Sequence, residues 1–243
     1  MRYVTGMDES YPQAPASPVY VLAAHPNLRE SRATRRMLDA IRGLPGVDIN
    51  DLFASSPDYD IDVPAEQARA QAAQLVVLLH PIQWYSMPAL MKLWLDEVLA
   101  VGWAYGGGAA LQGKDLWLVA TTGGSEASYH PQGYNRYFFD AFVPPYEQTA
   151  ALCGMRFLPP MLLYGAHQAS DEEIAAHAAV FRDKLLSYPD WPEMDEVLDC
   201  PTCIVPATDL PRGRESSAAG PSRDAGAPWG DSAGMGAPRV GAE

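Results

Sequence analysis

Hydroxyl and basic side chains follow a short apolar run near the start of the chain. The run ends at His25, and a turn with four candidate contact residues comes soon after it: Ser31, Arg32, Ala33 and Thr34. An amphipathic stretch follows, and the first turn of a helix has free N–H groups and a dipole that attracts anions. With hydroxyl donors added, this turn is a candidate phosphate site. The alternative is that Ser31 only caps the helix and His25 only ends a turn.

Aromatic residues follow a second apolar run, at residues 75–80. The segment after it holds four candidate contact residues: Ile82, Gln83, Trp84 and Tyr85. Two aromatic side chains beside a glutamine could cover a planar ring, while backbone N–H groups of the loop meet its heteroatoms. The alternative is an aromatic plug over the end of a sheet.

Hydroxyls and paired glycines lie at the end of a third run, residues 115–121: Thr121, Thr122, Gly123 and Gly124. Glycines let the backbone approach a ligand closely, and the hydroxyls can donate to a flat polar ligand. A glycine pair also forms ordinary turns, so this segment indicates a site only together with the other two.

Several other chemistries lack their sequence patterns. The patterns GxxxxGK[ST], GxGxxG and GxSxG are absent. His25 and His80 each end an apolar run, but no further cysteine, histidine or carboxylate accompanies them at ligand spacing, so no metal is expected. Cys200 and Cys203 form a CxxC without a following helix or a second pair, and incidental cysteines are the simpler interpretation.

The elements that must position these loops alternate along the chain. The apolar runs cover five ranges: residues 19–24, 47–52, 75–80, 115–121 and 155–164. Helical patterns separate them, and Ser170 with Glu173 predicts a capping box for the last helix. This pattern predicts an α/β protein, a flavodoxin-like three-layer sandwich with a five-stranded parallel sheet of order 2-1-3-4-5 and helices on both faces. Ligands of such sheets bind outside the carboxyl ends of the strands, so we expect the three loops to meet there.

Composition and charge exclude some functions and set the expected boundaries. The 243 residues carry a net charge of −13 without a basic run, which excludes a simple nucleic-acid binder. Few cysteines, no signal-like N-terminus and no long apolar segment indicate a cytoplasmic protein. We expect a flexible extension at residues 1–18 and a domain at residues 19–188. Residues 189–243 read as an acidic extension and a disordered tail rich in Ala, Gly, Pro and Ser.

Three segments of the chain resemble a known family. They are HPIQWYSMPALMKLWLDEVLAVGWAYGGG, GKDLWLVATTGG and CGMRFLPP. They resemble the NAD(P)H-quinone oxidoreductases of the flavodoxin-like superfamily, and in particular the KefF-type ancillary proteins of glutathione-regulated potassium-efflux systems. The resemblance covers roughly residues 18–188 and leaves out both termini.

The resemblance implies non-covalent FMN, NAD(P)H as co-substrate and a homodimer with the flavin near the subunit interface. The implied FMN contacts are His25 and residues 31–34 on the phosphate side, with residues 82–85 and 121–124 beside the isoalloxazine. The implied activity is two-electron, ping-pong hydride transfer from NAD(P)H through flavin N5 to a quinone. The family often has asparagine where this chain has Thr34. The contact with FMN that an asparagine amide makes through both its oxygen and its nitrogen would therefore be lost.

Related animal quinone reductases use a tyrosine and a histidine beyond the glycine pair. Tyr129 falls on the tyrosine position, Asn135 stands where the histidine would be, and His130 is out of register. Tyr129 is therefore the candidate catalytic residue, as a donor to developing oxyanion charge.

Two other readings stay open at this point. The resemblance also allows a regulatory flavoprotein subunit of a potassium-efflux antiporter, peripheral on the cytosolic face of the inner membrane. A one-electron carrier like flavodoxin is disfavoured by the aromatic loop after residues 75–80 and by the long loop after residues 115–121, which together give room for a second substrate.

Overall fold

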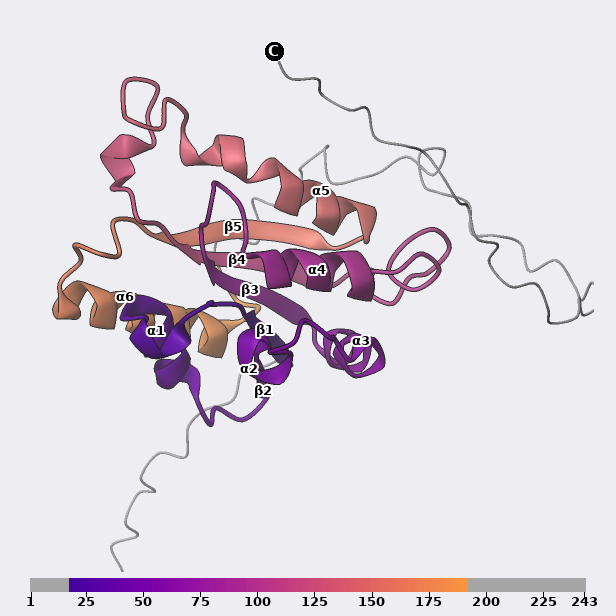
Figure 1. Cartoon of the computed structure of the whole chain (residues 1–243). Helices are drawn as coiled ribbons and strands as arrows, with labels where there is room; N and C mark the ends of the chain where they lie inside the picture. The colour runs from indigo at the N-terminus through magenta and orange to yellow at the C-terminus, as the bar shows by residue number, and fades with distance from the viewer. Residues whose placement is uncertain (1–17, 192–243) are drawn as a thin grey trace, which may run out of the picture. The chain divides into compact units, whose positions relative to one another are not determined.

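The structure, a computed structural model, describes residues 18–191, and these form a five-stranded parallel sheet (Figure 1). The strands are β1 (Val19–Ala23), β2 (Val47–Asp51), β3 (Leu75–Pro81), β4 (Asp115–Thr121) and β5 (Arg156–Leu163). Their order is β2-β1-β3-β4-β5, so the predicted α/β flavodoxin-like sheet is confirmed. The expected N-terminal extension, up to residue 17, and the CxxC of Cys200 and Cys203 lie outside the described residues.

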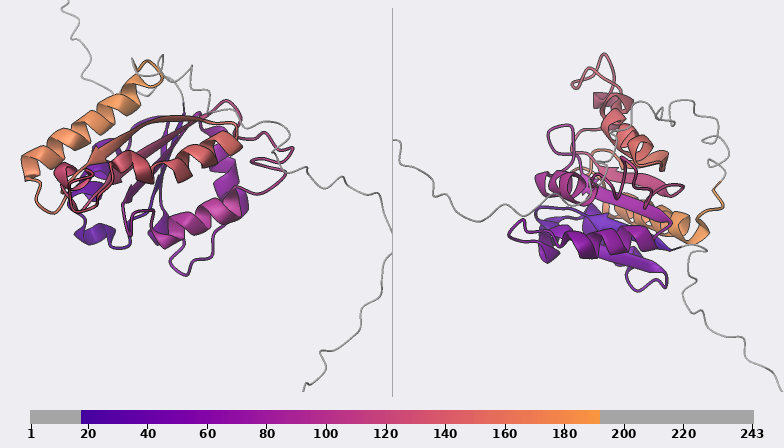
Figure 2. Two further views of the ribbon diagram at one scale, coloured as in Figure 1. Left: turned by 90° about the horizontal axis from the view of Figure 1, so that it is seen from above. Right: turned by 90° about the vertical axis from the view of Figure 1, so that its right-hand side faces the viewer.

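Helices cover both faces of the sheet, as predicted (Figures 1 and 2). On one face α1 (Ala33–Ile41) packs beside α6 (Asp171–Ser187). The other face carries α3 (Val63–Ala72), α4 (Ala89–Val98) and α5 (Pro144–Leu152). Shorter helical segments lie in the connections: α2 (Leu52–Ser55), η1 (Leu28–Glu30), η2 (Glu126–Ser128) and η3 (Phe139–Phe142).

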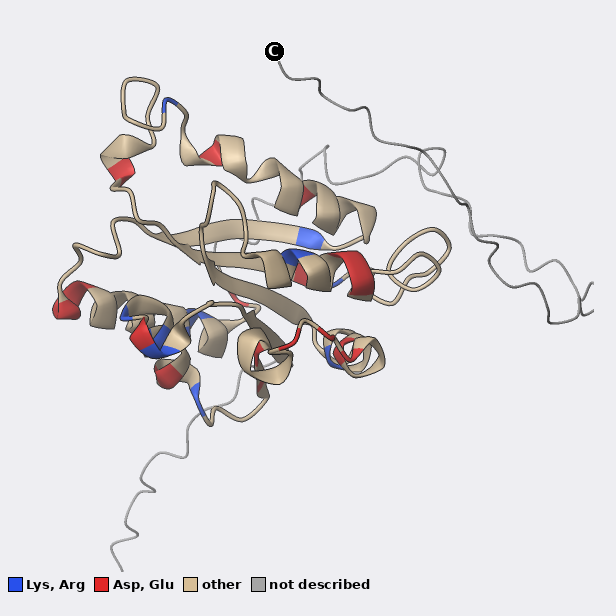
Figure 3. Ribbon diagram, viewed as in Figure 1, with Lys and Arg blue, Asp and Glu red and all other residues tan. Residues whose placement is uncertain are grey.

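The three central apolar runs become strands because both of their faces are buried: the residues of β1 and β4 are all buried, and so are those of β3 up to Pro81. In β1, Tyr20 and Leu22 enter the core under α3, α4 and α5, while Val19 and Val21 enter the core under α1 and α6. Alternate residues thus point to opposite helix layers. Because both layers are apolar, the strand is apolar at every position and does not alternate with polar residues as a half-exposed strand does. Figure 3 accordingly shows the acidic and basic positions mainly on helices and loops, with few on the strands.

The strand registers bring the candidate loops to one edge of the sheet. Pro81 at the end of β3 pairs with Thr121 at the end of β4, and Thr121 pairs with Leu163 of β5. Ala23, at the end of β1, pairs with Leu79 of β3. From β1 the chain continues to β2 on one side and then to β3 on the other, so the strand order reverses between β1 and β3. Doubly wound proteins form their ligand crevice at this point of the sheet.

Polar anchors stabilise the opposite, amino-terminal edge. The Arg156 guanidinium makes two hydrogen bonds to the Asp115 carboxylate, at 2.7 and 2.9 Å, and the Tyr188 hydroxyl donates to the same carboxylate at 2.5 Å. Trp191 is buried against Trp117, so packing continues past residue 188, the expected end of the domain. The edge farthest from the candidate loops is therefore fixed by buried charges and aromatic contacts.

Two further sequence predictions concern helices. The Ser170 side chain accepts from the Glu173 N–H, and the Glu173 carboxylate accepts from the Ser170 N–H, so the capping box of α6 is confirmed. Between residues 18 and 191, no helix combines the length and the apolarity that a membrane span requires.

Candidate functional site

A cavity of about 450 Å³ opens at the carboxyl edge of the sheet. The loops that follow β1, β3, β4 and β5 all contribute to its lining. Of the predicted site residues, nine line it: His25, Ser31, Arg32, Ala33, Ile82, Gln83, Thr121, Thr122 and Gly123. The structure thus brings the three predicted loops together around one hollow.

The turn before α1 combines a helix cap with the cavity wall. The Ser31 hydroxyl oxygen accepts the Thr34 N–H at 3.1 Å, so Ser31 caps α1 and lines the cavity at the same time. The first N–H groups of α1 have no partner within the helix and face this end. Arg32 is tied to Asp171 at the start of α6 by an ion pair of 2.6 Å. Ser31 therefore caps the helix, as one of the two alternatives has it, and its place in the cavity wall is compatible with the other, a phosphate contact.

Thr34 is placed differently from its neighbours. It is buried and is not part of the cavity lining, and its hydroxyl oxygen has no hydrogen-bond partner among the described residues. The predicted donor of the turn therefore lies beneath the cavity wall in this structure.

His25 offers the cavity a neutral imidazole. Its Nδ1 accepts the Asn27 N–H at 3.1 Å, which leaves the proton of the neutral ring on Nε2. Burial lowers the pKa of His25, while the nearby Asp51 carboxylate opposes that shift. His25 is thus a donor without a full charge, which suits contact with a polar ligand group.

The loop after β3 is a tight turn in a strained conformation. Gln83 and Ser86 exchange two backbone hydrogen bonds, of 2.9 and 3.0 Å, and the two residues between them have positive φ: Trp84 at 50° and Tyr85 at 65°. This geometry is that of a type I′ turn, which normally contains Asn-Gly because other residues are strained there. Trp84 is 94% exposed, so its own packing does not enforce the conformation. Strain of this kind is typical of functional segments.

Trp84 and Tyr85 border a second cavity, of about 360 Å³. Ile82 lines both cavities, so the two hollows share a wall. Two more predicted residues, Gly124 and Tyr129, line the second one. Burial raises the pKa of Tyr129, whose phenol therefore keeps its proton at neutral pH and can donate it in a hydrogen bond.

Asn135, which replaces the histidine of the animal quinone reductases, has a defined place in this cavity. The Tyr85 hydroxyl donates to Asn135 Oδ1 at 3.4 Å, and Asn135 Nδ2 donates to the Ser128 hydroxyl at 3.2 Å. An amide neither gains nor loses a proton as an acid or base near neutral pH, so Asn135 can orient Tyr85 but cannot replace histidine as a proton donor or acceptor. His130 packs on Phe138 outside the lining of both cavities.

The glycine pair after β4 leaves room that side chains would fill. A Cβ on Gly123 would lie 3.0 Å from His167 Nε2, and a Cβ on Gly124 would lie 2.5 Å from the Ser128 hydroxyl oxygen. The Thr122 hydroxyl donates to the Gly124 carbonyl at 2.7 Å, which fixes the turn. Among the described residues, the Gly123 N–H donates to no acceptor and is free for a ligand.

The loop after β5 also reaches the cavity, and sequence reasoning missed it. Ala166 and His167 line the first cavity. The Ala166 N–H donates to the Thr122 carbonyl at 2.9 Å, so this loop is joined to the glycine turn. The rule that ligands bind at strand ends, extended from three strands to the fifth, would have found His167. Other missed residues are Asn27, Glu30 and Pro81 in the first cavity, and Ser128 and Tyr134 in the second.

These features define a flavodoxin-like α/β protein with a helix turn suited to an anion and two loops suited to a flat ring. Residues 17–185 match the family described as flavodoxin-like fold, and the chain belongs to that family. A curated relative, the glutathione-regulated potassium-efflux system ancillary protein KefF of Citrobacter koseri, is 43% identical over 171 residues, which are 70% of this chain and 96% of the relative.

Solved structures show the same fold. General stress protein 14 of Treponema denticola, solved in complex with FMN, has 32% identity and a TM-score of 0.66, over 69% of this chain and 97% of that one. An NADPH-quinone reductase from P. pentosaceus has 24% identity and a TM-score of 0.64, over 69% of this chain and 97% of the other.

Proposed function

We propose that the chain is an FMN-dependent NAD(P)H:quinone oxidoreductase and that residues 19–188 form its FMN-binding domain. The observation that carries this proposal is the pair of adjoining cavities, around which an anion-type helix turn, a strained aromatic turn and a glycine turn lie together. The FMN complex of the Treponema relative and the quinone-reductase neighbour support it. The cytoplasm, with its NAD(P)H, is the matching compartment.

The residues present fit FMN. The phosphate would bind at the start of α1, where the Ser31 hydroxyl and the free first-turn N–H groups converge, and the neutral His25 would donate from Nε2. The isoalloxazine would lie between the turn after β3 and the glycine turn, whose Gly123 N–H is free. The cavity is open to this ring because Gly123 has no Cβ to narrow it.

The second cavity suits the co-substrates. The chemistry that FMN supplies when bound is hydride transfer from NAD(P)H to an acceptor such as a quinone. Tyr129, kept protonated by burial, would donate to the developing oxyanion of the acceptor. Asn135 would hold the Tyr85 phenol in place, and the Tyr85 ring stacks on Phe142 with centroids 5.3 Å apart.

A homodimer belongs to the proposal. Several large apolar side chains beside the second cavity are exposed: Trp84, Tyr85, Tyr134, Tyr137 and Phe138. Exposed aromatic groups of this extent mark an interaction surface, and a second copy of the chain would cover them and exclude water from the cavity.

A steady-state assay tests the activity. The purified protein, saturated with FMN, should oxidise NAD(P)H when a quinone such as menadione is added, with parallel lines in double-reciprocal plots because the two substrates bind in turn. Protein that binds FMN but oxidises NAD(P)H no faster than free FMN does would refute the activity.

Replacing Ser31 by alanine should weaken FMN binding about 10- to 150-fold, because a hydrogen bond to a charged phosphate contributes about 1.5–3 kcal/mol. The lost helix cap should also lower the free energy of unfolding by about 1 kcal/mol. Isothermal titration with FMN and urea unfolding of the flavin-free protein measure the two effects.

Ser170→Ala is the matched control, because Ser170 caps α6 with the same hydroxyl-to-N–H bond. It should lose comparable stability and keep its FMN affinity. Equal FMN dissociation constants for the two variants would contradict the phosphate site.

A second function is proposed from the curated relatives. The KefF protein of Citrobacter koseri is described as ancillary to a glutathione-regulated potassium-efflux system, and this chain covers 96% of it. The chain would then bind a potassium-efflux antiporter from the cytosolic side as a regulatory flavoprotein subunit. Co-purification with the antiporter of the same organism, and potassium efflux that depends on the chain, would support this function; efflux unchanged by its deletion would refute it.

A further inference from the structure

Two buried side chains outside both cavities connect the ends of the strained turn. His80 lies at the end of β3 and is fully buried, and Tyr146 comes from the first turns of α5. The two rings are stacked, with centroids 5.8 Å apart, and the Tyr146 hydroxyl lies 3.3 Å from His80 Nε2. His80 Nδ1 lies 3.0 Å from the Pro81 carbonyl oxygen, and the Tyr146 phenol also contacts the Ser86 hydroxyl.

Elementary chemistry fixes the direction of every bond in this chain of contacts. A carbonyl oxygen only accepts, so His80 Nδ1 carries the proton and donates to Pro81. Burial lowers the pKa of His80 to about 4, so the ring is neutral and Nε2 is bare. The Tyr146 hydroxyl must therefore donate to Nε2, and its oxygen can act only as an acceptor toward the nearby Ser86 hydroxyl. All polar atoms of the two buried rings are thereby paired.

This chain of contacts runs from one end of the turn to the other. Pro81 directly precedes the segment of the predicted ring contacts, and Ser86 closes the two-bond turn that contains Trp84 and Tyr85. The conformation of that turn is strained, and Trp84 contributes almost no packing to hold it. A strained segment persists only where its surroundings over-determine it, so another element must supply the restraint.

We propose that His80 and Tyr146 are positioning residues, which hold the turn at residues 83–86 in its strained conformation through the contacts that lead from Ser86 to Pro81. The proposal rests on the proposed function in one respect, since the turn is held in place for FMN. The link also connects α5, which follows the loop of Tyr129, to the loop after β3. The two walls of the second cavity are therefore held in a fixed relation to each other.

Tyr146→Phe tests the proposal, because it removes the central hydroxyl and keeps the ring. We expect hydrogen exchange of the Gln83 and Ser86 amides, the two donors of the turn, to become about tenfold faster. FMN should bind about fivefold to tenfold more weakly, the loss expected for one net hydrogen bond. Ser86→Ala, a change at an exposed residue that leaves the core intact, should produce the same two effects, and the double variant should be no worse than Tyr146→Phe alone.

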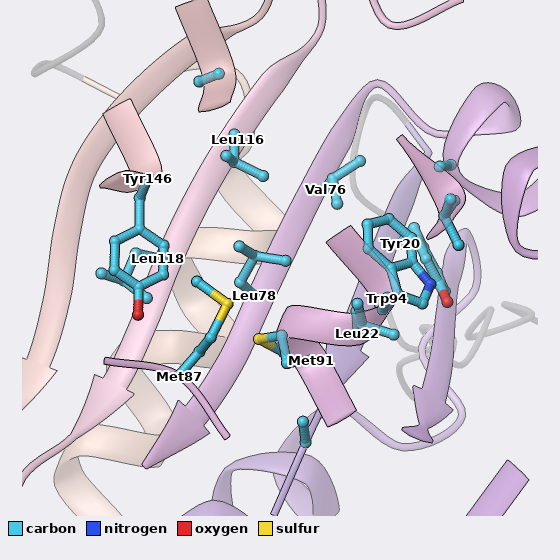
Figure 4. Packing of buried hydrophobic residues seen from close by; sticks show 14 of the residues in the cluster. Tyr20, Leu22, Val76, Leu78, Met87, Met91, Trp94, Leu116, Leu118 and Tyr146 are labelled. Carbon is cyan, nitrogen blue, oxygen red and sulfur yellow. The ribbon is translucent and has the colours of Figure 1, made fainter. Parts of the chain in front are cut away.

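Tyr20→Phe is the matched control. Tyr20 belongs to the same core cluster, and its hydroxyl is bonded to the buried Glu66 at the other edge of the sheet. Figure 4 shows the two tyrosines on opposite sides of this core, with Tyr20 beside Trp94. The control should lose stability while the exchange of the turn amides and the affinity for FMN stay as in the wild type.

The outcomes separate the two proposals. If Tyr146→Phe and Ser86→Ala leave the turn amides and the FMN affinity within twofold of the wild type, or if Tyr20→Phe changes them equally, the positioning role is wrong. If the wild type binds no FMN while the turn amides respond as expected, the proposed function fails and the restraint on the turn stands.

Discussion

The double variant Trp84→Asn/Tyr85→Gly should be more stable than the wild type and a much poorer enzyme. Asparagine and glycine adopt the positive φ angles of this turn at little cost, and each relieved residue is expected to contribute about 1 kcal/mol. The lost stacking of Tyr85 on Phe142 offsets part of the gain. The free energy of unfolding should therefore rise by roughly 1 kcal/mol in urea titrations of the flavin-free protein.

The same change should lower kcat/KM for quinone reduction by about 10- to 100-fold, since two aromatic contacts with flat ligands are removed. A gain in stability together with a loss of activity is expected where a strained backbone conformation serves the function. Tyr59→Asn is the matched control, because Tyr59 is another half-exposed tyrosine at positive φ, 65°, outside both cavities. It should gain stability with unchanged kcat/KM; a double variant that also keeps its activity would show that the aromatic turn does not contact the substrates.

Arg156→Met should produce the largest loss of stability. The Asp115 carboxylate is 4% exposed and receives two bonds from the guanidinium, so removing Arg156 leaves a buried charge with only the Tyr188 hydroxyl. Breaking a buried pair in this way costs about 3–5 kcal/mol. Urea unfolding of the flavin-free protein should show this decrease. Because the pair lies at the amino-terminal edge of the sheet, FMN affinity should change less than twofold wherever the variant is folded.

Arg42→Met is the control for the loss of a charge at the surface. Its ion pair with Asp39, at 3.2 Å, is solvent-exposed, so the variant should lose no more than about 0.5 kcal/mol. Asp115→Asn/Arg156→Met should recover part of the stability, since the uncompensated charge is gone. A single variant as stable as Arg42→Met would show that the buried pair does not anchor β4 to β5.

The sequence predicts the architecture well because the three central strands, β1, β3 and β4, are buried on both faces. Continuous apolar runs such as that of β3, separated by helical patterns, leave few topologies open, and the order of the strands follows from right-handed crossovers. The strand-end rule then brings the three predicted loops to one cavity without knowledge of any side-chain contact.

What the sequence could not predict depends on contacts distant along the chain. Thr34 is a donor by type and spacing, and the structure adds what the sequence does not show, that its side chain is buried and is not part of the cavity lining. His167 reaches the cavity only because the loop after β5 is hydrogen-bonded to the glycine turn. Positive φ at Trp84 and Tyr85 runs against their intrinsic preferences and is imposed by the surrounding structure.

An anaerobic absorbance titration tests the central proposal most directly. The purified protein should retain FMN or bind it one per chain, with flavin absorption bands in the visible region. NADH or NADPH should bleach these bands under anaerobic conditions, and a quinone added afterwards should restore them within the mixing time. A protein that stays colourless after FMN is added, or whose bound flavin is not bleached by either nicotinamide, would contradict the account.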